Sequence, residues 1–339
     1  ARVTFHGAGL DRSFAGLNTE MVLNSPDASA RLIVHLVGNL WVGSDQGVRA
    51  FASDGVDLGV VAGPSVVGPV TLLWRHDAQT VGVGGGGSQP GAVKLLAMDG
   101  QEKGAFDAVD FAQQPLFPAP LTPRGAARDA QGNVWLSRGQ SQGGQAELYT
   151  FTSSGVFQGR VSSPPMNGVD WEPWGIAKLD DSSMVVASAG HHQTTLAIYP
   201  SGGTQARLYQ LSLLSCVSTY SAAPSCSGGG STMPALGLSL RGNQLSVGTA
   251  NWDSLPPIVG NAGVFTQPAF DFVATTPHQA NGPEQLPGGV AQLVWFGNVW
   301  LAVPVTGDCL ALMDATTLTV QGCWAHMQGV KTALPLDAP

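Results

Sequence analysis

The chain has 339 residues, a net charge of −8 at pH 7, and only 11% charged residues. Its few Lys and Arg residues are scattered, which excludes the basic surface that nucleic-acid binding requires. No apolar run reaches the roughly 20 residues of a membrane-spanning helix, so we expect no transmembrane segment. The length exceeds the needs of one small core, so we expect two domains or one large domain built from repeats.

A four-residue motif recurs along the chain and predicts the architecture. Successive copies are separated by about two, two and one repeat units of about fifty residues each. This period is typical of β-propeller blades. Three copies carry a Trp at the same position, and these Trp residues are predicted to pack between blades. The copies are Gly38-Asn39-Leu40-Trp41, Gly132-Asn133-Val134-Trp135, Gly242-Asn243-Gln244-Leu245 and Gly297-Asn298-Val299-Trp300.

Residues 123–161 form the clearest unit. Residues 129–133 and 153–155 are predicted hairpin turns, because Gly, Asn and Asp tolerate the positive φ that tight turns need. The apolar stretches on either side are predicted strands. Four antiparallel strands within about fifty residues make one propeller blade.

In chain order, the same pattern predicts an all-β chain that forms a single propeller domain over residues 1–339. In the first unit, Leu32-Ile33-Val34 is the expected inner strand. Seven blades are expected, with the ring closed by strands from both termini, and six blades with decorated termini are the alternative. The predicted blades cover residues 31–62, 70–109, 123–161, 174–211, 235–273 and 288–325, with a last blade from 2–24 plus 327–336.

Four cysteines occur as two locally spaced pairs. Cys216 and Cys226 bracket a Ser-rich and Pro-rich loop, and Cys309 and Cys323 flank a predicted hairpin. This spacing predicts two disulfides and therefore a periplasmic, cell-surface or secreted protein. Four buried free thiols are the alternative.

Two segments at predicted blade starts resemble a known group of propellers. They are residues 123–135, which begin Pro123-Arg124-Gly125, and residues 172–177, which begin Glu172-Pro173-Trp174. They are similar to the blade starts of NHL-repeat proteins, gluconolactonase-like lactonases and streptogramin-lyase-like proteins. The resemblance implies a propeller. Lactonases of this group hold a divalent metal in the central tunnel with a Glu, Asn and Asp set, which cannot be placed in this sequence.

Blade topology predicts which loops share a face of the ring. Loops between second and third strands and loops between blades lie around the same mouth of the tunnel, and binding sites favour such loops. The acidic, amide, Trp and His residues of these loops are the candidate ligand-binding residues. They are Asp170, Trp171, Glu172, His191, Asn251, Trp252, Asp253 and His278.

A divalent ion is a further expectation for this face. Oxygen ligands favour Ca²⁺ over transition metals, and the candidate ligands are Asp170, Glu172, Asn251, Asp253 and Glu284. The alternative is structural: each Trp packs against a neighbouring blade, the acids cap turns, and the pair His191-His192 is exposed.

Two functions remain open from the sequence. The first is a secreted or surface-exposed binding or assembly module that recognises a protein or glycan, or associates with copies of itself. The alternative is a metal-dependent, lactonase-like hydrolase or lyase with its site at the tunnel mouth. No local nucleophile motif identifies an enzyme.

Overall fold

Antiparallel strands make up nearly all of the structure, a computed structural model. It describes residues 2–5, 12–15, 40–53, 55–85, 93–118, 121–139, 146–164, 171–188, 195–202, 205–211, 235–250, 259–275, 278–279, 282–283 and 286–336. Within these ranges the helical structure is α1 (Pro64–Val67), and no helix there has the length and apolar character to cross a membrane.

Six four-stranded sheets form the blades of a propeller. Blade 1 contains β30 (Val330–Pro335), β3 (Leu40–Ser44), β4 (Gly47–Phe51) and β5 (Asp57–Ala62), from the inside outwards. Blade 2 contains β6 (Val70–Arg75), β7 (Thr80–Gly85), β8 (Val93–Ala97) and β9 (Glu102–Ala105). Blade 3 contains β10 (Thr122–Arg128), β11 (Val134–Gly139), β12 (Glu147–Phe151) and β13 (Phe157–Val161).

The remaining blades follow the same order of strands. Blade 4 contains β14 (Pro173–Lys178), β15 (Met184–Ser188), β16 (Thr195–Tyr199) and β17 (Arg207–Gln210). Blade 5 contains β18 (Ala235–Arg241), β19 (Gln244–Thr249), β21 (Ala262–Thr266) and β22 (Phe272–Thr275). Blade 6 contains β26 (Gln292–Phe296), β27 (Val299–Val303), β28 (Cys309–Met313) and β29 (Val320–His326).

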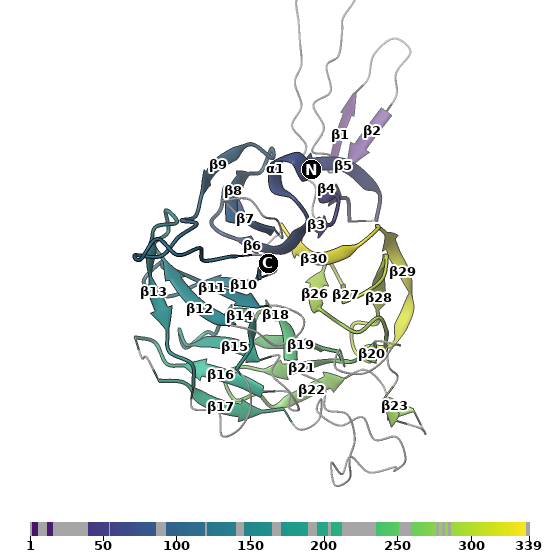
Figure 1. Cartoon of the computed structure of the whole chain (residues 1–339). Coiled ribbons are helices and arrows are strands. Elements are labelled where there is room, and N and C mark those ends of the chain that lie inside the picture. Colours follow the sequence, from purple (N-terminus) through teal and green to yellow (C-terminus); the bar gives the residue numbers. More distant parts are fainter. Residues whose placement is uncertain are drawn as a thin grey trace, which may run out of the picture.

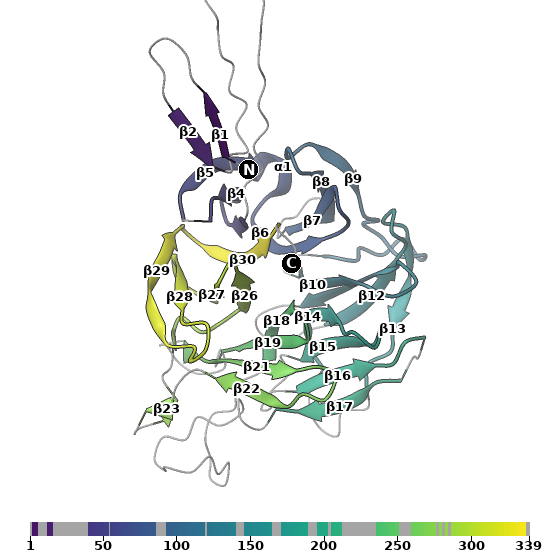
Figure 2. The same ribbon diagram turned by 180° about the vertical axis from the view of Figure 1, so that it is seen from behind.

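Three two-stranded sheets are not hydrogen-bonded into the blade sheets. They pair β1 (Arg2–Phe5) with β2 (Arg12–Ala15), β20 (Val259–Gly260) with β25 (Leu286–Pro287), and β23 (His278–Gln279) with β24 (Gly282–Pro283). The blades themselves are arranged around a central axis, and the inner strand of each blade contacts the inner strand of the next (Figures 1 and 2).

The expected seventh blade is not formed. Strand β30 pairs with β3, as in Leu40 opposite Pro335, and so takes the inner position in blade 1. That blade is then complete with four strands, and β1 and β2 pair with each other as a separate hairpin. Strands from distant parts of the chain do close the ring, as expected, but with β3–β5 as the partners of the C-terminal strand. The propeller therefore has six blades, the number predicted as the alternative to seven. Leu32-Ile33-Val34, the expected inner strand, lies outside the described residues, and β30 occupies its place.

The apolar core is divided among the contacts between neighbouring blades. Trp41 packs among residues of blades 1 and 2, Trp135 among those of blades 3 and 4, and Trp300 among those of blades 5 and 6. All three are buried. The prediction that these repeated Trp residues pack between blades is therefore confirmed.

The same motif points its Trp toward opposite neighbours in blades 3 and 6. Val134 pairs with Arg128 across residues 129–133, whereas Val299 pairs with Phe296 across the tight turn 297–298. Val134 faces blade 2 and Val299 faces blade 1, the blade after blade 6. Successive residues of a strand alternate faces. Trp135, which follows Val134, therefore faces the following blade, and Trp300, which follows Val299, faces the preceding blade.

The disulfide predicted between Cys309 and Cys323 is present. It joins β28 to β29 of blade 6, with a Cα–Cα distance of 5.7 Å. Cys216 and Cys226 lie outside the described residues, so their pairing stays a prediction.

Candidate functional site

A central channel is lined by the inner strands of the six blades, and it contains two adjoining cavities. The cavity at the starts of these strands has a volume of about 480 Å³ and is called here the loop-side cavity, because the loops between blades lead into it. The cavity at their ends has a volume of about 640 Å³ and is called the turn-side cavity. Five residues line both and so form the layer between them: Leu73, Ala126, Ile176, Leu238 and Gln292.

Glycines bring the inner strands close together on the loop side. A Cβ atom on Gly125 would lie 2.0 Å from the Trp174 carbonyl oxygen, and one on Gly237 would lie 2.0 Å from that of Ala291. In strands β10 and β18 the pairing register shifts beside these glycines, and in β14 it shifts around Gly175, which marks β-bulges. Bulges redirect a side chain locally, and here the residues at the bulges, Arg124 and Trp174, line the loop-side cavity.

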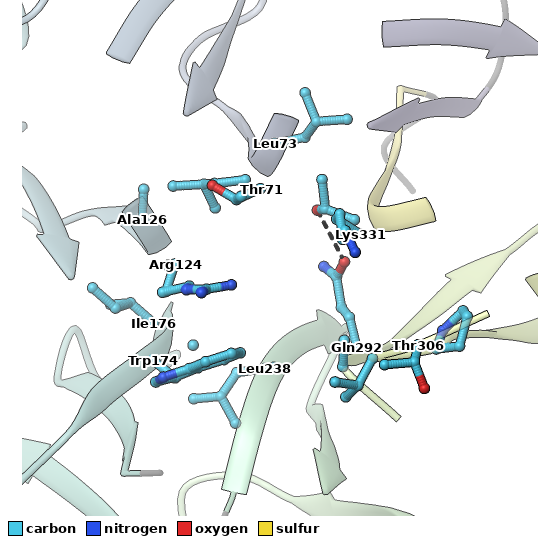
Figure 3. A pocket seen from close by; sticks show the side chains of 18 residues that line it. Thr71, Leu73, Arg124, Ala126, Trp174, Ile176, Leu238, Gln292, Thr306 and Lys331 are labelled. Carbon is cyan, nitrogen blue, oxygen red and sulfur yellow. Dashed lines mark hydrogen bonds between the residues drawn. The ribbon is translucent and has the colours of Figure 1, made fainter. Parts of the chain in front are cut away.

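Arg124 and Trp174 form a stacked pair in this cavity. The guanidinium carbon of Arg124 lies 4.5 Å from the centre of the Trp174 ring, and both side chains extend into the cavity from adjacent blades (Figure 3). Trp174 is buried and packs with Leu236 and Ala250 of blade 5. The Ser137 hydroxyl donates to the Trp174 carbonyl oxygen at 2.5 Å, which ties blade 3 to the strand that carries this ring. The indole therefore gives Arg124 a fixed support.

The Arg124 guanidinium has unmet hydrogen-bonding capacity. Its Nε atom is buried without a hydrogen-bond partner, and the described residues provide no ion pair for the group. Burial lowers the pKa of Arg124 to about 10, because the surroundings disfavour the charged form. The side chain nevertheless remains a cation at neutral pH, with donors available to a ligand.

Polar groups from blades 6 and 1 form the opposite wall. The Gln292 side-chain oxygen accepts from the Thr332 hydroxyl at 3.3 Å and from the Ala333 backbone N–H at 3.2 Å. Its Nε2 donates to the Ser239 hydroxyl at 3.2 Å, so the amide links the inner strands of blades 5, 6 and 1. Lys331 also lines this wall, across the cavity from Arg124 (Figure 3).

The turn-side cavity is also basic, but its three Arg side chains have partners. Arg128 donates to the His76 carbonyl oxygen at 3.0 Å, and Arg75 donates to the Ala78 carbonyl oxygen at 3.0 Å. Arg241 lies over the Trp295 ring, 3.3 Å from its centre. Lys178 at this rim is exposed.

His76 is buried beside the turn-side cavity. Its ring contacts Trp74 and Phe106 edge to face, with centroids 6.3 Å and 6.2 Å away. Burial lowers the pKa of His76, and the nearby Arg128 lowers it further. Its Nδ1 has no hydrogen-bond partner in the described structure.

The two predicted ligand-binding residues with described side chains do not line the loop-side cavity. Trp171 is half-buried and packs against the cluster between blades 3 and 4, which is the structural alternative considered for it. Glu172 is buried, and its backbone N–H donates to the Ser188 hydroxyl at 3.5 Å. His278 lies in β23, which Figures 1 and 2 place outside the ring of blades.

The other predicted residues cannot be placed. Across the described ranges no group of three His, Cys, Asp or Glu side chains is arranged to hold a metal ion. Calcium binding therefore stays a prediction. The predicted ligand and metal residues that lie outside the described residues are Asp170, His191, Asn251, Trp252, Asp253 and Glu284.

Sequence reasoning missed Arg124, Trp174, Gln292 and Lys331. The signal for the first two lay in the repeated Pro-X-Gly segments, Pro123-Arg124-Gly125 and Pro173-Trp174-Gly175. The pattern marks these segments as blade starts and does not distinguish the side chain between Pro and Gly. Gln292 and Lys331 stand in no repeated pattern that distinguishes them from other inner-strand residues.

Comparisons with known proteins show the fold. No protein-family model matches the sequence, and no curated protein matches it either. Among solved structures, a protein from Lactobacillus plantarum aligns over 88% of this chain and 99% of its own, with TM-score 0.53 and 12% identity. A chain of the nidogen/laminin complex aligns over 87% of this chain and 97% of its own, with TM-score 0.51 and 12% identity. Virginiamycin B lyase from Staphylococcus aureus aligns over 80% of this chain and 71% of its own, with TM-score 0.44 and 14% identity.

The chain is therefore a six-bladed β-propeller, which confirms the resemblance found at the blade starts at the level of the fold. One of the similar structures is a chain of the nidogen/laminin complex. Because propellers host unrelated activities, the fold alone does not define the function.

Proposed function

We propose that this protein is an extracytoplasmic binding module whose loop-side face recognises a glycan or protein ligand, with the loop-side cavity receiving one group of that ligand. The observation that carries the proposal is the Arg124–Trp174 pair, a supported cation with an unused buried donor in a cavity of about 480 Å³. Such a cavity, with a few oriented polar groups among apolar ones, is typical of ligand sites.

The chemistry of the lining favours binding over catalysis. Its described polar side chains are Thr71, Arg124, Trp174, Gln292, Thr306, Lys331 and Thr332. This set contains no carboxylate, imidazole or thiol that could act as a general acid, base or nucleophile near neutral pH. The lactonase-like alternative needs groups from the loops beyond the described residues.

The disulfide supports the extracytoplasmic location that is part of this proposal. A bond between Cys309 and Cys323 persists where the surroundings are oxidising, as outside the cytoplasm. A periplasmic, cell-surface or secreted site of action is part of the proposal, as are recognition of a protein or glycan and self-association.

Intrinsic fluorescence tests the proposal directly. We expect a ligand from a panel of glycans and extracellular proteins to change the Trp emission and raise the melting temperature of the intact protein. Because Trp174 lines the cavity, Trp174→Phe should lose most of the fluorescence response. Trp324→Phe is the control, since Trp324 packs against Phe51 and Phe296 in the contact between blades 6 and 1.

The panel is run with calcium and again after EDTA treatment, which also tests the predicted ion. A response that EDTA abolishes and calcium restores would support a calcium site on the same face. A complete panel with no response, or a response that Trp174→Phe leaves intact, would contradict binding at the loop-side cavity.

A further inference from the structure

Positive charge gathers along the channel of an acidic protein. The chain has 15 Lys and Arg residues against 23 Asp and Glu residues. Two of the cations line the loop-side cavity and four line the turn-side cavity, whereas the described lining of both contains no Asp or Glu. A cleft of one sign with apolar walls focuses the electric field and concentrates oppositely charged ligands. The channel is therefore suited to anions although the whole chain is acidic.

The two cavities differ in what their cations can still bind. On the turn side, Arg75 and Arg128 donate to backbone carbonyl oxygens and Arg241 stacks on Trp295. On the loop side, Arg124 stacks on Trp174 but has a buried Nε without a partner. A partly desolvated cation without a counter-charge is costly, and an anion that enters the cavity would remove this cost.

The geometry selects an oxyanion rather than a halide. Arg has a planar fork of N–H donors that matches the two oxygens of a carboxylate, phosphate or sulfate group. Stacking on the indole fixes the plane of this fork, so little side-chain entropy is lost on binding. Lys331 provides a second positive charge from the opposite wall, and Figure 3 shows open space between the two side chains.

We infer that the loop-side cavity binds an oxyanion group of the ligand, held between the Arg124 guanidinium and the Lys331 ammonium. This inference rests on the proposed binding function and names the chemical class of ligand. A carboxylate of an acidic sugar and a free phosphate would use the same donors, so the probes must distinguish these sources.

Isothermal titration calorimetry on the intact protein tests the inference with three probes: glucuronate, inorganic phosphate and glucose. Glucuronate and glucose share a sugar ring and differ in the carboxylate. We expect at least one of the two anions to bind, and glucose to bind at least about tenfold more weakly than glucuronate if the carboxylate is the recognised group. Binding of glucuronate alone identifies a carboxylate on a ring, and binding of phosphate alone identifies a phosphate group.

Variants assign the binding to the named donors. Arg124→Met should weaken anion binding at least about tenfold, because it removes the charge and the fork. Arg124→Lys should restore part of the loss, since it keeps the charge without the fork. Lys331→Met should weaken binding several-fold and provides an independent test if a substitution at Arg124 disturbs folding, which thermal unfolding of each variant checks. Arg241→Met is the matched control at the turn-side cavity and should leave the affinity within about twofold.

Two results overturn the inference. One is the absence of binding by both anions, and the other is anion binding that Arg124→Met and Lys331→Met leave unchanged. If neither anion binds while a neutral glycan or a protein still gives a Trp174-dependent fluorescence response, the oxyanion assignment is wrong and the proposed binding function is supported. If neither the anions nor the neutral glycans and proteins produce a response, the oxyanion assignment and the proposed binding function are both wrong.

Discussion

The two ends of the channel carry charge of the same sign but use it differently. On the turn side, Arg128 and Arg75 complete hydrogen bonds to the carbonyl oxygens of nearby turns. On the loop side, Arg124 has an aromatic support and no hydrogen-bonding partner for its buried Nε. Satisfied cations stabilise the fold, whereas unsatisfied ones lower stability and leave donors available to a ligand.

The difference follows from where each Arg lies along its inner strand. Arg128 is the last residue of β10 and reaches the carbonyl oxygen of His76, in the turn after β6 of blade 2. Arg124 lies near the start of the same strand, at a bulge beside Gly125, where the side chain turns into the channel. One strand therefore supplies a structural cation at one end and a candidate ligand-binding cation at the other.

The largest expected effect comes from disturbing the backbone that shapes the loop side. Gly125→Val places a Cβ atom 2.0 Å from the Trp174 carbonyl oxygen, so blades 3 and 4 must separate. We expect the free energy of unfolding to fall by about 3 kcal/mol or more, measured by urea denaturation. Gly104→Val is the control, because a Cβ atom there meets nothing within 4 Å. Equal stability of the two variants would show that the close approach at Gly125 is not needed.

Removing one Arg from each end should give effects of opposite sign. Arg124→Met removes a partly desolvated charge and is expected to raise the free energy of unfolding by about 1 kcal/mol. Arg128→Met removes the hydrogen bond to the His76 carbonyl oxygen and is expected to lower it by about 1 kcal/mol. Urea denaturation of both variants beside the wild type measures the difference. If Arg124→Met is instead the more destabilising of the two, its stacking on Trp174 outweighs its desolvation and the comparison fails.

The smallest expected effect is a pH dependence from the turn side. Because the pKa of His76 is lowered in the folded state by burial and by Arg128, against an opposing contribution from Asp77, the unfolded chain binds a proton more readily. The free energy of unfolding should therefore be fully retained above about pH 6.5 and fall as the pH drops through the unfolded pKa toward the folded one.

Denaturation of the wild type and His76→Asn at several pH values tests this expectation. His76→Asn should show a smaller loss of stability on acidification than the wild type. His326→Asn, at an exposed position in β29, is the control and should keep the wild-type dependence. A His76→Asn curve parallel to the wild-type curve would mean that the His76 ring does not contribute to acid sensitivity.

Much of the fold could be predicted because blade structure is encoded locally. Asp129 shows how: its side chain accepts from the backbone N–H groups of Gln131 and Asn133, while Gly132 adopts a φ of +88°. Such turns are set by a few neighbouring residues and repeat with the blade. The number of blades depended instead on which strand the C-terminal segment joins, a pairing across almost the whole chain that no local pattern specifies.

The candidate site was less predictable for a related reason. The loop residues chosen by composition, such as Trp171 and Glu172, are packed or buried where they are described. Arg124 and Trp174 stand in segments whose pattern predicts blade starts, and they meet because adjacent inner strands lie side by side. A contact between residues fifty positions apart depends on blade packing, so composition could not reveal it.

The sequence by itself determined that this protein is a ring of four-stranded blades with Trp residues packed between them and a disulfide in a late hairpin, because turns and strand alternation act over a few residues. Only the tertiary structure decided that six blades close the ring, that Trp135 and Trp300 face opposite neighbours, and that Arg124 stacks on Trp174 opposite Lys331. Those features depend on strand register and on contacts between distant segments, which form only when the whole ring is assembled.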